Sequence, residues 1–261
     1  MKSTIVFFDI DGTLLNQNKE VLDSTRKAIK QLQDKGVYTA IATGRTPHLF
    51  DWLCEELNIN TFVSMNGQYV VFEGEIIYNN PMNAQHIHEL AQLVECNGDA
   101  LAYVNEVDIR SSREGHLLFE EVFGYYKMEY PIADRDFYKH TDVHQVTIIC
   151  EQDQLSGYVE KFPQFNFVPV HEGGADILPK GCSKASGIAY ILERGGFKLE
   201  NTFAFGDGDN DIEMLGAVGV GVAMGNASTH VQKHANYITA SCDHDGIYEA
   251  LVKFELVEKD E

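Results

Sequence analysis

The sequence predicts an α/β fold: a doubly wound, Rossmann-like parallel sheet interrupted by an inserted α+β domain. Two observations lead to this prediction. Strand-like apolar segments alternate with amphipathic helical segments up to about residue 80 and again after residue 182, and such alternation is typical of a parallel sheet. Between these parts the alternation is irregular. We therefore expect a discontinuous core of residues 1–80 and 182–261, with residues 81–181 forming the inserted domain.

Residues 4–8 begin the alternation, because their β-branched and aromatic side chains are typical of a buried strand. Apolar residues then recur at helical spacing over residues 23–35, and Gly36 follows where a helix cap is expected. Thr46-Pro47 predicts a second helix, since proline favours the first helical position. The other strands expected in this part are 37–42, 61–65, 69–72 and 75–78, the last two as a hairpin.

The second helix is expected to hold Leu49, Phe50, Leu53 and Leu57, with Trp52 in the core or at an interface. The inserted domain is expected to contain helices near 84–96, 113–123 and 153–162 and strands near 100–110, 143–150 and 165–171. After residue 183 we expect helices at 184–195, near 210–216, near 227–234 and from about 245, and strands at 202–205, 218–222 and 237–239.

The composition argues against several classes of partner. Lys and Arg number 20 against 40 Asp and Glu, which gives a formal net charge of −20. Such a surface repels polyanions, so we expect neither nucleic acid nor an anionic membrane as a partner. Only four apolar residues precede Asp9, too few for a signal peptide, and no apolar run reaches the roughly 18 residues of a membrane span. The five cysteines form no Cys-x-x-Cys pair, and we interpret them as reduced thiols of a cytoplasmic protein.

Polar, glycine-rich loops follow four of the predicted core strands. Ligands bind beyond the carboxyl ends of the strands in open α/β sheets, so these loops are the expected site. They are Asp9-Ile10-Asp11-Gly12-Thr13, Thr43-Gly44-Arg45, Asn66-Gly67 and Gly206-Asp207-Gly208-Asp209-Asn210-Asp211. Loops of this kind also serve simply as turns and helix caps, so each one alone would decide little. Together they predict a carboxylate cluster of Asp9, Asp11 and Asp207.

Asp9 and Asp11 are the hardest of these residues to explain as turn residues. At about 4 Å and an effective dielectric near 20, two carboxylates repel by roughly 4 kcal/mol, so a cation or a proton must compensate. Mg²⁺ prefers one or two carboxylates together with water and substrate phosphate. Lys184, at the start of a predicted helix, is either a solvated surface lysine or a cation directed at a phosphoryl group or at Asp9. Beside the four loops, we favour the second interpretation.

These motifs resemble those of the haloacid dehalogenase (HAD) superfamily, and specifically its Cof-type phosphatases with a large α/β cap. In chain order the matching motifs are Asp9-x-Asp11-Gly12-Thr13, Thr43-Gly44-Arg45, Lys184 and Gly206-Asp207-x-x-Asn210-Asp211. The insert lies between the second and third motifs, where this subgroup carries its cap. The resemblance therefore covers nearly the whole chain, and four motifs in the right order make it specific.

The resemblance implies a Mg²⁺-dependent phosphatase that hydrolyses small phosphorylated metabolites, such as sugar phosphates or phosphorylated cofactors, through an aspartyl phosphate. It implies that Asp9 attacks the phosphoryl group and that Asp11 protonates the leaving oxygen and then activates water. The implied catalytic residues are Asp9, Asp11, Thr43 and Lys184. The implied Mg²⁺ ligands are Asp9, the backbone carbonyl of Asp11, Asp207 and Asp211. The implied phosphoryl-binding groups are Thr43, Lys184, Asn210 and the amides of Ile10 and Gly44, with Arg45 and Asn66 expected at the substrate.

The cap, residues 81–181, is expected to exclude water and to select the leaving group. Its candidate selector side chains are Arg110, Arg113, His171 and Glu172. Two other functions remain open: a phosphomutase on the same core, and a non-enzymatic phosphate-binding regulator. Asp11 argues against the regulator, because a pure binder has no need of an acid–base group. We expect the protein to be a monomer or a homodimer.

Overall fold

The chain forms two compact units, each with its own sheet. A computed structural model describes residues 3–125, 128–170 and 174–259. One unit, which we call the core unit, comprises Met1–Arg45, Leu49–Asn79 and Ser183–Glu261. The other, the insert unit, comprises Thr46–His48 and Asn80–Cys182. Each unit is described by itself below.

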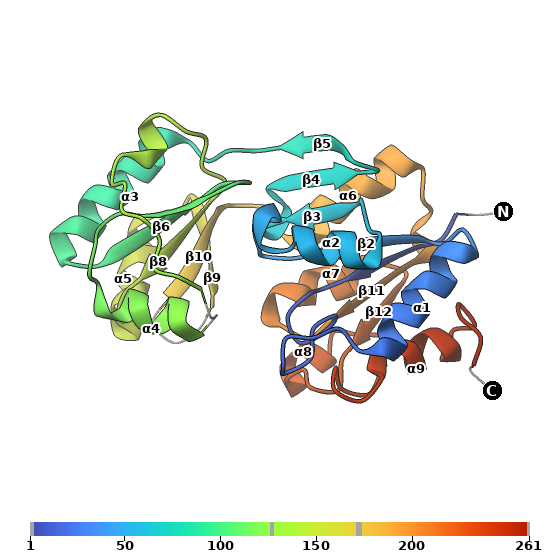
Figure 1. The fold of residues 1–261 in the computed structure, drawn as a ribbon. Coiled ribbons are helices and arrows are strands. Elements are labelled where there is room, and N and C mark those ends of the chain that lie inside the picture. The colour runs from blue at the N-terminus through green and yellow to red at the C-terminus, as the bar shows by residue number, and fades with distance from the viewer. Residues whose placement is uncertain (1–2, 126–127, 171–173, 260–261) are drawn as a thin grey trace. The chain divides into compact units, whose positions relative to one another are not determined.

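Eight strands form the sheet of the core unit, in the order β13-β12-β11-β1-β2-β3-β4-β5 (Figure 1). They are β1 (Ile5–Phe8), β2 (Tyr38–Ala42), β3 (Phe62–Ser64), β4 (Tyr69–Phe72), β5 (Glu75–Asn79), β11 (Thr202–Gly206), β12 (Val220–Ala223) and β13 (Tyr237–Ile238). The first six in this order run parallel, whereas β4 pairs antiparallel with both β3 and β5. Because β1 lies between β11 and β2, the loops after these three strands are neighbours at one edge.

Helices cover both faces of this sheet, as a doubly wound fold requires. On one face, the apolar sides of α1 (Asp23–Asp34), α2 (Asp51–Leu57) and α9 (Gly246–Lys253) pack with Val6 and Phe8. On the other, α6 (Lys184–Gly195), α7 (Ile212–Ala217) and α8 (Thr229–Gln232) pack with Ile5 and Phe7. The side chains of β1 therefore alternate between two separate cores, and the predicted fold class is confirmed.

Two predicted elements of the core unit differ from the structure. The helix expected from Thr46-Pro47 is divided into a 3₁₀ turn, Pro47–Leu49, and α2, because Phe50 has φ −135° and interrupts the helix. Trp52 on α2 is 44% exposed, so it does not lie in the core, and the other expected place, an interface, stays a prediction. The helix predicted near 227–234 is also shorter, spanning only Thr229–Gln232.

The insert unit contains a five-stranded antiparallel sheet in the order β7-β6-β8-β10-β9. Its strands are β6 (Ala100–Val104), β7 (Ile109–Ser111), β8 (Gln145–Ile149), β9 (Phe165–Pro169) and β10 (Gly174–Pro179). Helices α3 (Ala84–Asn97) and α5 (Gln152–Lys161) pack on one face and α4 (Leu117–Tyr125) on the other. The sequence missed β10, whose apolar residues are interrupted by Asp176.

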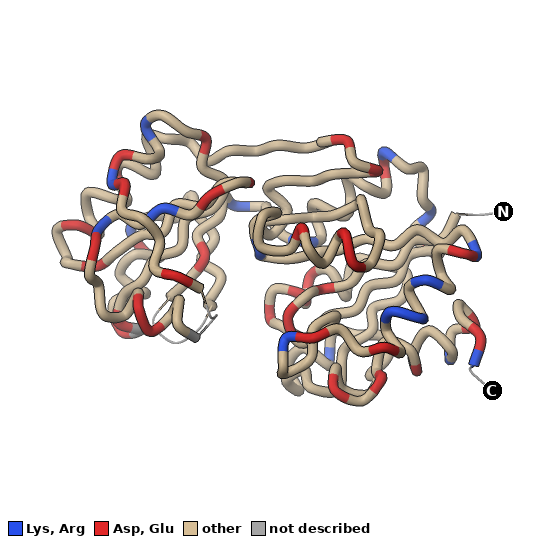
Figure 2. Tube along the Cα trace, viewed as in Figure 1, with Lys and Arg blue, Asp and Glu red and all other residues tan. Residues whose placement is uncertain are grey.

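Asp and Glu residues are spread over helices and loops of both units (Figure 2). The acidic residues that give the net charge of −20 are therefore not concentrated in one segment. Among the described residues, no helix is both long and apolar enough to cross a membrane.

Candidate active site

Four segments that the sequence singled out meet at one edge of the core sheet. Asp9 follows β1, Thr43 follows β2 and Asp207 follows β11, and these strands are adjacent. Lys184 is the first residue of α6, and Ser183 caps that helix by accepting a hydrogen bond from the N–H of Ser186. Topology therefore places these side chains together although they come from distant parts of the chain.

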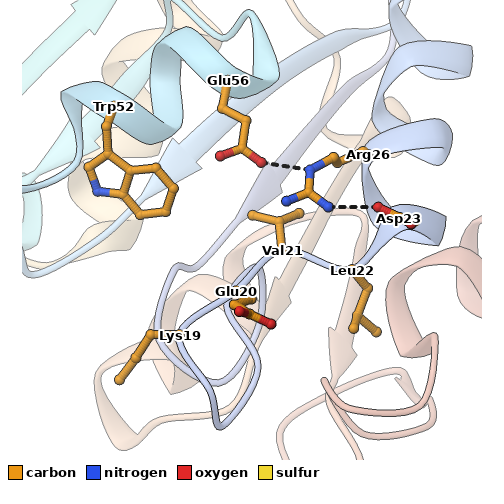
Figure 3. A pocket seen from close by; sticks show the side chains of 8 residues that line it. All are labelled: Lys19, Glu20, Val21, Leu22, Asp23, Arg26, Trp52 and Glu56. Atoms are coloured by element: carbon orange, nitrogen blue, oxygen red, sulfur yellow. Dashed lines mark hydrogen bonds and ion pairs between the residues drawn. The ribbon is translucent and has the colours of Figure 1, made fainter.

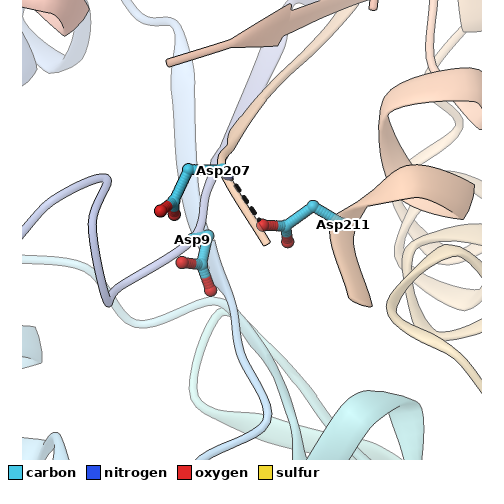
Figure 4. Close-up of side chains that lie close together, drawn as sticks. All are labelled: Asp9, Asp207 and Asp211. Carbon is cyan, nitrogen blue, oxygen red and sulfur yellow. Dashed lines mark hydrogen bonds between the residues drawn. The ribbon is translucent and has the colours of Figure 1, made fainter. Parts of the chain in front are cut away.

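The centre of the site is a cluster of three carboxylates, Asp9, Asp207 and Asp211 (Figure 4). One oxygen of each lies within 4.8 Å of the others. Lys184 is fully buried and donates from Nζ to Asp9 Oδ1 at 2.6 Å and to Asp211 Oδ1 at 2.7 Å. The second oxygen of Asp211 accepts the backbone N–H groups of Asp207 and Gly208, both at 2.9 Å. Asp211 thus orders the loop that carries Asp207.

The charges of this cluster do not balance. Burial raises the pKa of Asp9 well above its ordinary range; Lys184 opposes this rise, while Asp211 and Asp207 add to it. Burial, assisted by the charge of Asp211, raises the pKa of Asp207 to about 7. Burial disfavours the charge of Lys184, but Asp211 and Asp9 outweigh burial and raise its pKa. Among the described residues, two buried carboxylates and the half-buried one of Asp207 face the single ammonium of Lys184. They form an oxygen-rich, anionic site of the kind that binds a hard cation.

Asp11 lies outside this cluster, contrary to the expected grouping of Asp9, Asp11 and Asp207. Arg45 donates to both of its oxygens, from Nε and Nη2, each at 2.7 Å, and Lys19 donates from Nζ at 2.7 Å. Burial alone would raise the pKa of Asp11, but hydrogen bonds and charge from Arg45 and then Lys19 outweigh burial and lower it. The third member of the cluster is Asp211, so the two acids of the first loop have different surroundings.

The predicted phosphoryl-binding groups also lie close to one another. Thr43 is buried, and its hydroxyl accepts the N–H of Arg45 at 3.0 Å. A Cβ atom added at Gly44 would lie 3.1 Å from the amide nitrogen of Asn66. Asn210 in turn donates to Asn66 Oδ1 at 3.3 Å. These contacts bring the loops after β2, β3 and β11 together beside the carboxylates.

Two of the four candidate selector side chains of the cap, Arg110 and Arg113, lie in the described part of the chain. Arg110 pairs with Asp108, and Arg113 donates to the Gly98 carbonyl at 2.8 Å, so both have partners within the insert unit. His171 and Glu172 lie outside the described residues.

A shallow hollow of about 410 Å³ lies between α1 and α2 in the core unit (Figure 3). Its lining residues are Lys19, Glu20, Val21, Leu22, Asp23, Arg26, Trp52 and Glu56. Lys19 lines this hollow and also contacts Asp11, but the three carboxylates of the cluster do not line it.

Comparison with known families identifies this arrangement. The profile of the haloacid dehalogenase-like hydrolases matches residues 6–251, nearly the entire chain. The chain belongs to this family. The resemblance noted in the sequence is therefore confirmed, and so is the expected activity, that of a HAD-type phosphatase.

Several relatives match this HAD chain along nearly its whole length. The Bacillus subtilis protein YkrA is 38% identical, covering 98% of this chain and all of the relative. The 5-amino-6-(5-phospho-D-ribitylamino)uracil phosphatase YcsE of the same species is 29% identical over 95% of this chain and 94% of the relative. The solved structure of the HAD subclass IIB sugar phosphatase BT4131 is 30% identical and gives a TM-score of 0.87, covering 98% of this chain and 100% of that chain.

Two residues of the HAD site were missed by the sequence reasoning. Lys19 reaches Asp11 from a turn in which it adopts φ +65°, and no local pattern indicated that contact. Asn226 donates to Asp207 Oδ2 at 2.9 Å. It could have been found, because it follows a predicted core strand, as do the four loops that were considered.

Proposed function

We propose that the chain hydrolyses phosphate monoesters of small metabolites through an aspartyl phosphate formed on Asp9. The observation that carries this proposal is the placement of Asp9 beyond the central strand. There its carboxylate is held by Lys184 at 2.6 Å beside two further carboxylates. A buried carboxylate that is paired with a lysine, at a site suited to a divalent cation, can attack a phosphoryl group whose negative charge is neutralised at the same place.

The residues present fit a divalent cation. Their donor atoms are carboxylate oxygens, the ligands that Mg²⁺ prefers, and in the described part of the chain one ammonium group, that of Lys184, pairs with this cluster of two buried acids and one half-buried acid. We assign Asp9, Asp207, Asp211 and the backbone carbonyl of Asp11 as the groups that would hold Mg²⁺. When bound, Mg²⁺ would supply positive charge for the phosphoryl oxygens.

Asp9 and Asp11 divide the proton and bond changes between them. A carboxylate oxygen of Asp9 attacks phosphorus while the bond from phosphorus to the leaving oxygen breaks, and the Asp11 carboxyl gives that oxygen its proton. Ionised Asp11 then takes a proton from the water that attacks phosphorus, and the bond to Asp9 breaks. Arg45 and Lys19 favour the ionised form of Asp11, which is the form needed for this second step.

Side chains around the cluster would hold the phosphoryl oxygens. Lys184 and the Thr43 hydroxyl are donors at the site, and Asn210 lies beside Asn66 next to Gly44. We assign these groups, together with the amides of Ile10 and Gly44, to binding of the phosphoryl group. We assign Arg45 to contact with the part of the substrate beyond the phosphoryl group. Preorganised donors of this kind stabilise charge in the transition state.

Sugar phosphates and phosphorylated cofactors are the proposed substrates. The names of two relatives support this choice, one a sugar phosphatase and the other a phosphatase of a phosphoribitylamino-uracil. We further propose that residues 81–181 act as a cap that selects the leaving group. The chain contains five widely spaced cysteines and no Cys-x-x-Cys pair, which supports a reducing, cytoplasmic location. The proposed assembly is a monomer or a homodimer.

A panel of phosphorylated metabolites tests this proposal. Purified enzyme with Mg²⁺ should release inorganic phosphate from several sugar phosphates, and Asp9→Asn should release none above background. Excess EDTA should stop the wild-type reaction. Full turnover in EDTA would rule out the metal-dependent mechanism, and transfer of phosphate back to substrate without release would indicate a phosphomutase.

A further inference from the structure

The side chain of Asn226 joins three segments of the core unit. Its Nδ2 donates to Asp207 Oδ2 and to the carbonyl of Gly12, both at 2.9 Å. Its Oδ1 accepts the N–H of Cys242 at 2.9 Å. One amide therefore connects the loops after β1 and β11 to the segment that follows β13. The two hydrogen bonds donated by Nδ2 and the one accepted by Oδ1 all have ordinary hydrogen-bond lengths.

Asp207 is oriented from both of its oxygens. Thr13 Oγ1 donates to Oδ1 at 3.2 Å, and Asn226 holds Oδ2. Gly12 makes this approach possible, because a Cβ atom there would lie 2.2 Å from Asp207 Oδ2. With one donor on each oxygen, the carboxylate keeps further lone pairs for a cation and loses rotational freedom.

The donors that orient Asp207 are neutral, and this sets it apart from its neighbours. Asp9 and Asp211 both contact the ammonium of Lys184. A hydroxyl and an amide fix the Asp207 carboxylate without placing a positive charge against an arriving cation. Partners that orient a metal ligand in this way contribute substantially to metal affinity in other proteins.

We propose that Asn226 is a positioning residue that holds Asp207 in the orientation required for divalent-cation binding. This inference rests on the proposed function, in which Asp207 is a ligand of Mg²⁺. Asn226 itself contacts neither substrate nor metal in this assignment. It acts through Asp207 and through the loop at Gly12.

Calorimetric titration with Mg²⁺ in the absence of substrate tests the proposal. Asn226→Ala should weaken Mg²⁺ binding by about 10-fold or more, as loss of an orienting partner typically does. The matched control is Asn236→Ala, because Asn236 also forms a side-chain hydrogen bond, accepting the N–H of Gly221 at 2.7 Å. Within the described part of the chain, Asn236 forms no hydrogen bond with Asp207, so its variant should bind Mg²⁺ within about twofold of wild type.

A kinetic measurement distinguishes positioning from a general loss of structure. In Asn226→Ala, raising the Mg²⁺ concentration should restore most of kcat, and the substrate KM at saturating Mg²⁺ should stay near the wild-type value. If Asn226→Ala does not fold, Asn226→Ser provides the same comparison with a smaller change. Metal-free thermal melts of these variants and Asn236→Ala confirm that folded proteins are compared.

The outcomes separate this inference from the proposed function. Wild-type Mg²⁺ affinity in a folded Asn226 variant, in an enzyme whose wild type binds Mg²⁺ and releases phosphate, would overturn the positioning role alone. Equal weakening in the Asn226 and Asn236 variants would also overturn it. Failure of the wild type to bind Mg²⁺ would overturn both proposals.

Discussion

Asp9 and Asp11 are separated by one residue, yet their surroundings differ in sign and in exposure. Asp9 is buried beside two carboxylates and one lysine, whereas the Asp11 side chain is 36% exposed and paired with two cations. In a strand, side chains two residues apart point to the same face, but this regularity stops where the strand ends. Two identical acids in the loop that follows can therefore have different environments. The two acids should therefore respond differently to the same substitution.

Replacement of each acid by its amide tests this difference. Asp9→Asn should reduce turnover by roughly 10⁴-fold or more, because the nucleophile is lost. Asp11→Asn should reduce it by about 10²–10⁴-fold, the usual contribution of an acid–base group. Rapid-quench mass spectrometry should detect a phosphorylated protein in Asp11→Asn but not in Asp9→Asn. A phosphoryl adduct on Asp9→Asn would show that the nucleophile is another residue.

Lys184 should contribute to stability as well as to catalysis. Lys184→Met leaves two buried carboxylates without their ammonium partner, and removal of one member of such a group typically costs about 3–5 kcal/mol. Saturating Mg²⁺ should return part of that loss, since a cation neutralises the same acids. Urea unfolding with and without Mg²⁺ measures both effects.

Lys180→Met is the matched control, because Lys180 lies four residues away and is exposed. Its substitution should change the free energy of unfolding by no more than about 0.5 kcal/mol. An equally small effect of Lys184→Met would contradict the contacts assigned to its ammonium group.

The sequence indicated most of the site because one rule, that ligands gather beyond parallel strand ends, places Asp9, Thr43 and Asp207 at one edge. It could not indicate which carboxylate would pair with which cation. That pairing depends on how the loop after β1 folds back, which brings Lys19 and Arg45 to Asp11 and leaves the cluster to Asp211. Tertiary contacts of this kind produce no periodic pattern in the sequence from which they could be predicted.

At the scale of elements, the spacing of apolar residues predicted the buried faces of helices and strands better than it predicted where these elements begin and end. Leu53 and Leu57 are buried whether or not the helix continues through Phe50, so the pattern could not show the break there. Strand β10 was missed for the opposite reason. Asp176 interrupts its apolar residues, although the carboxyl group is buried and accepts a hydrogen bond from Thr147 at 2.7 Å.

The turn after β1 depends on a glycine for two separate reasons. Gly12 has φ +78°, and a Cβ atom there would collide with Asp207. Gly12→Ala should therefore lower both stability and Mg²⁺ affinity. Gly36 at the end of α1 has a similar φ of +74° but open space around it, so Gly36→Ala should show only the cost of backbone strain, roughly 1 kcal/mol.

Thermal unfolding and Mg²⁺ titration of the two variants separate strain from collision. Both should melt at a lower temperature than wild type. Only Gly12→Ala should bind Mg²⁺ more weakly, because only there does the new methyl group displace a proposed ligand. Equal Mg²⁺ affinity in the two variants would contradict the close approach of Gly12 to Asp207.

At the scale of the molecule, the core unit depends on contacts between the two ends of the sequence. Lys184 and Asp9 are 175 residues apart, and β1 pairs with β11 in the centre of the sheet. The active site therefore exists only when both halves of the discontinuous core have come together. The insert unit has its own sheet and apolar core, so its stability can be perturbed without touching the catalytic residues.

The pH dependence of stability should reveal one buried acid of the insert unit. Burial raises the pKa of Asp176 to about 7 from an ordinary value of 3.8, and the hydrogen bond from Thr147 opposes this rise. Between these two values the folded chain keeps the proton that the unfolded chain releases. The contribution of protonated Asp176 to the free energy of unfolding is therefore fully present below pH 3.8. It decreases as the pH rises through this window and stops changing above about pH 7.

Asp176→Asn removes this titration while it keeps an oxygen for the Thr147 hydroxyl. The variant should gain stability relative to wild type as pH rises from about 4 to about 7, by a few kcal/mol at most, with no further gain above that range. Thr147→Val should instead raise the pKa of Asp176 further and extend the window upward. Denaturant unfolding at a series of pH values measures both, and a wild-type-to-Asn difference that does not vary with pH would show that Asp176 is ionised in the folded protein.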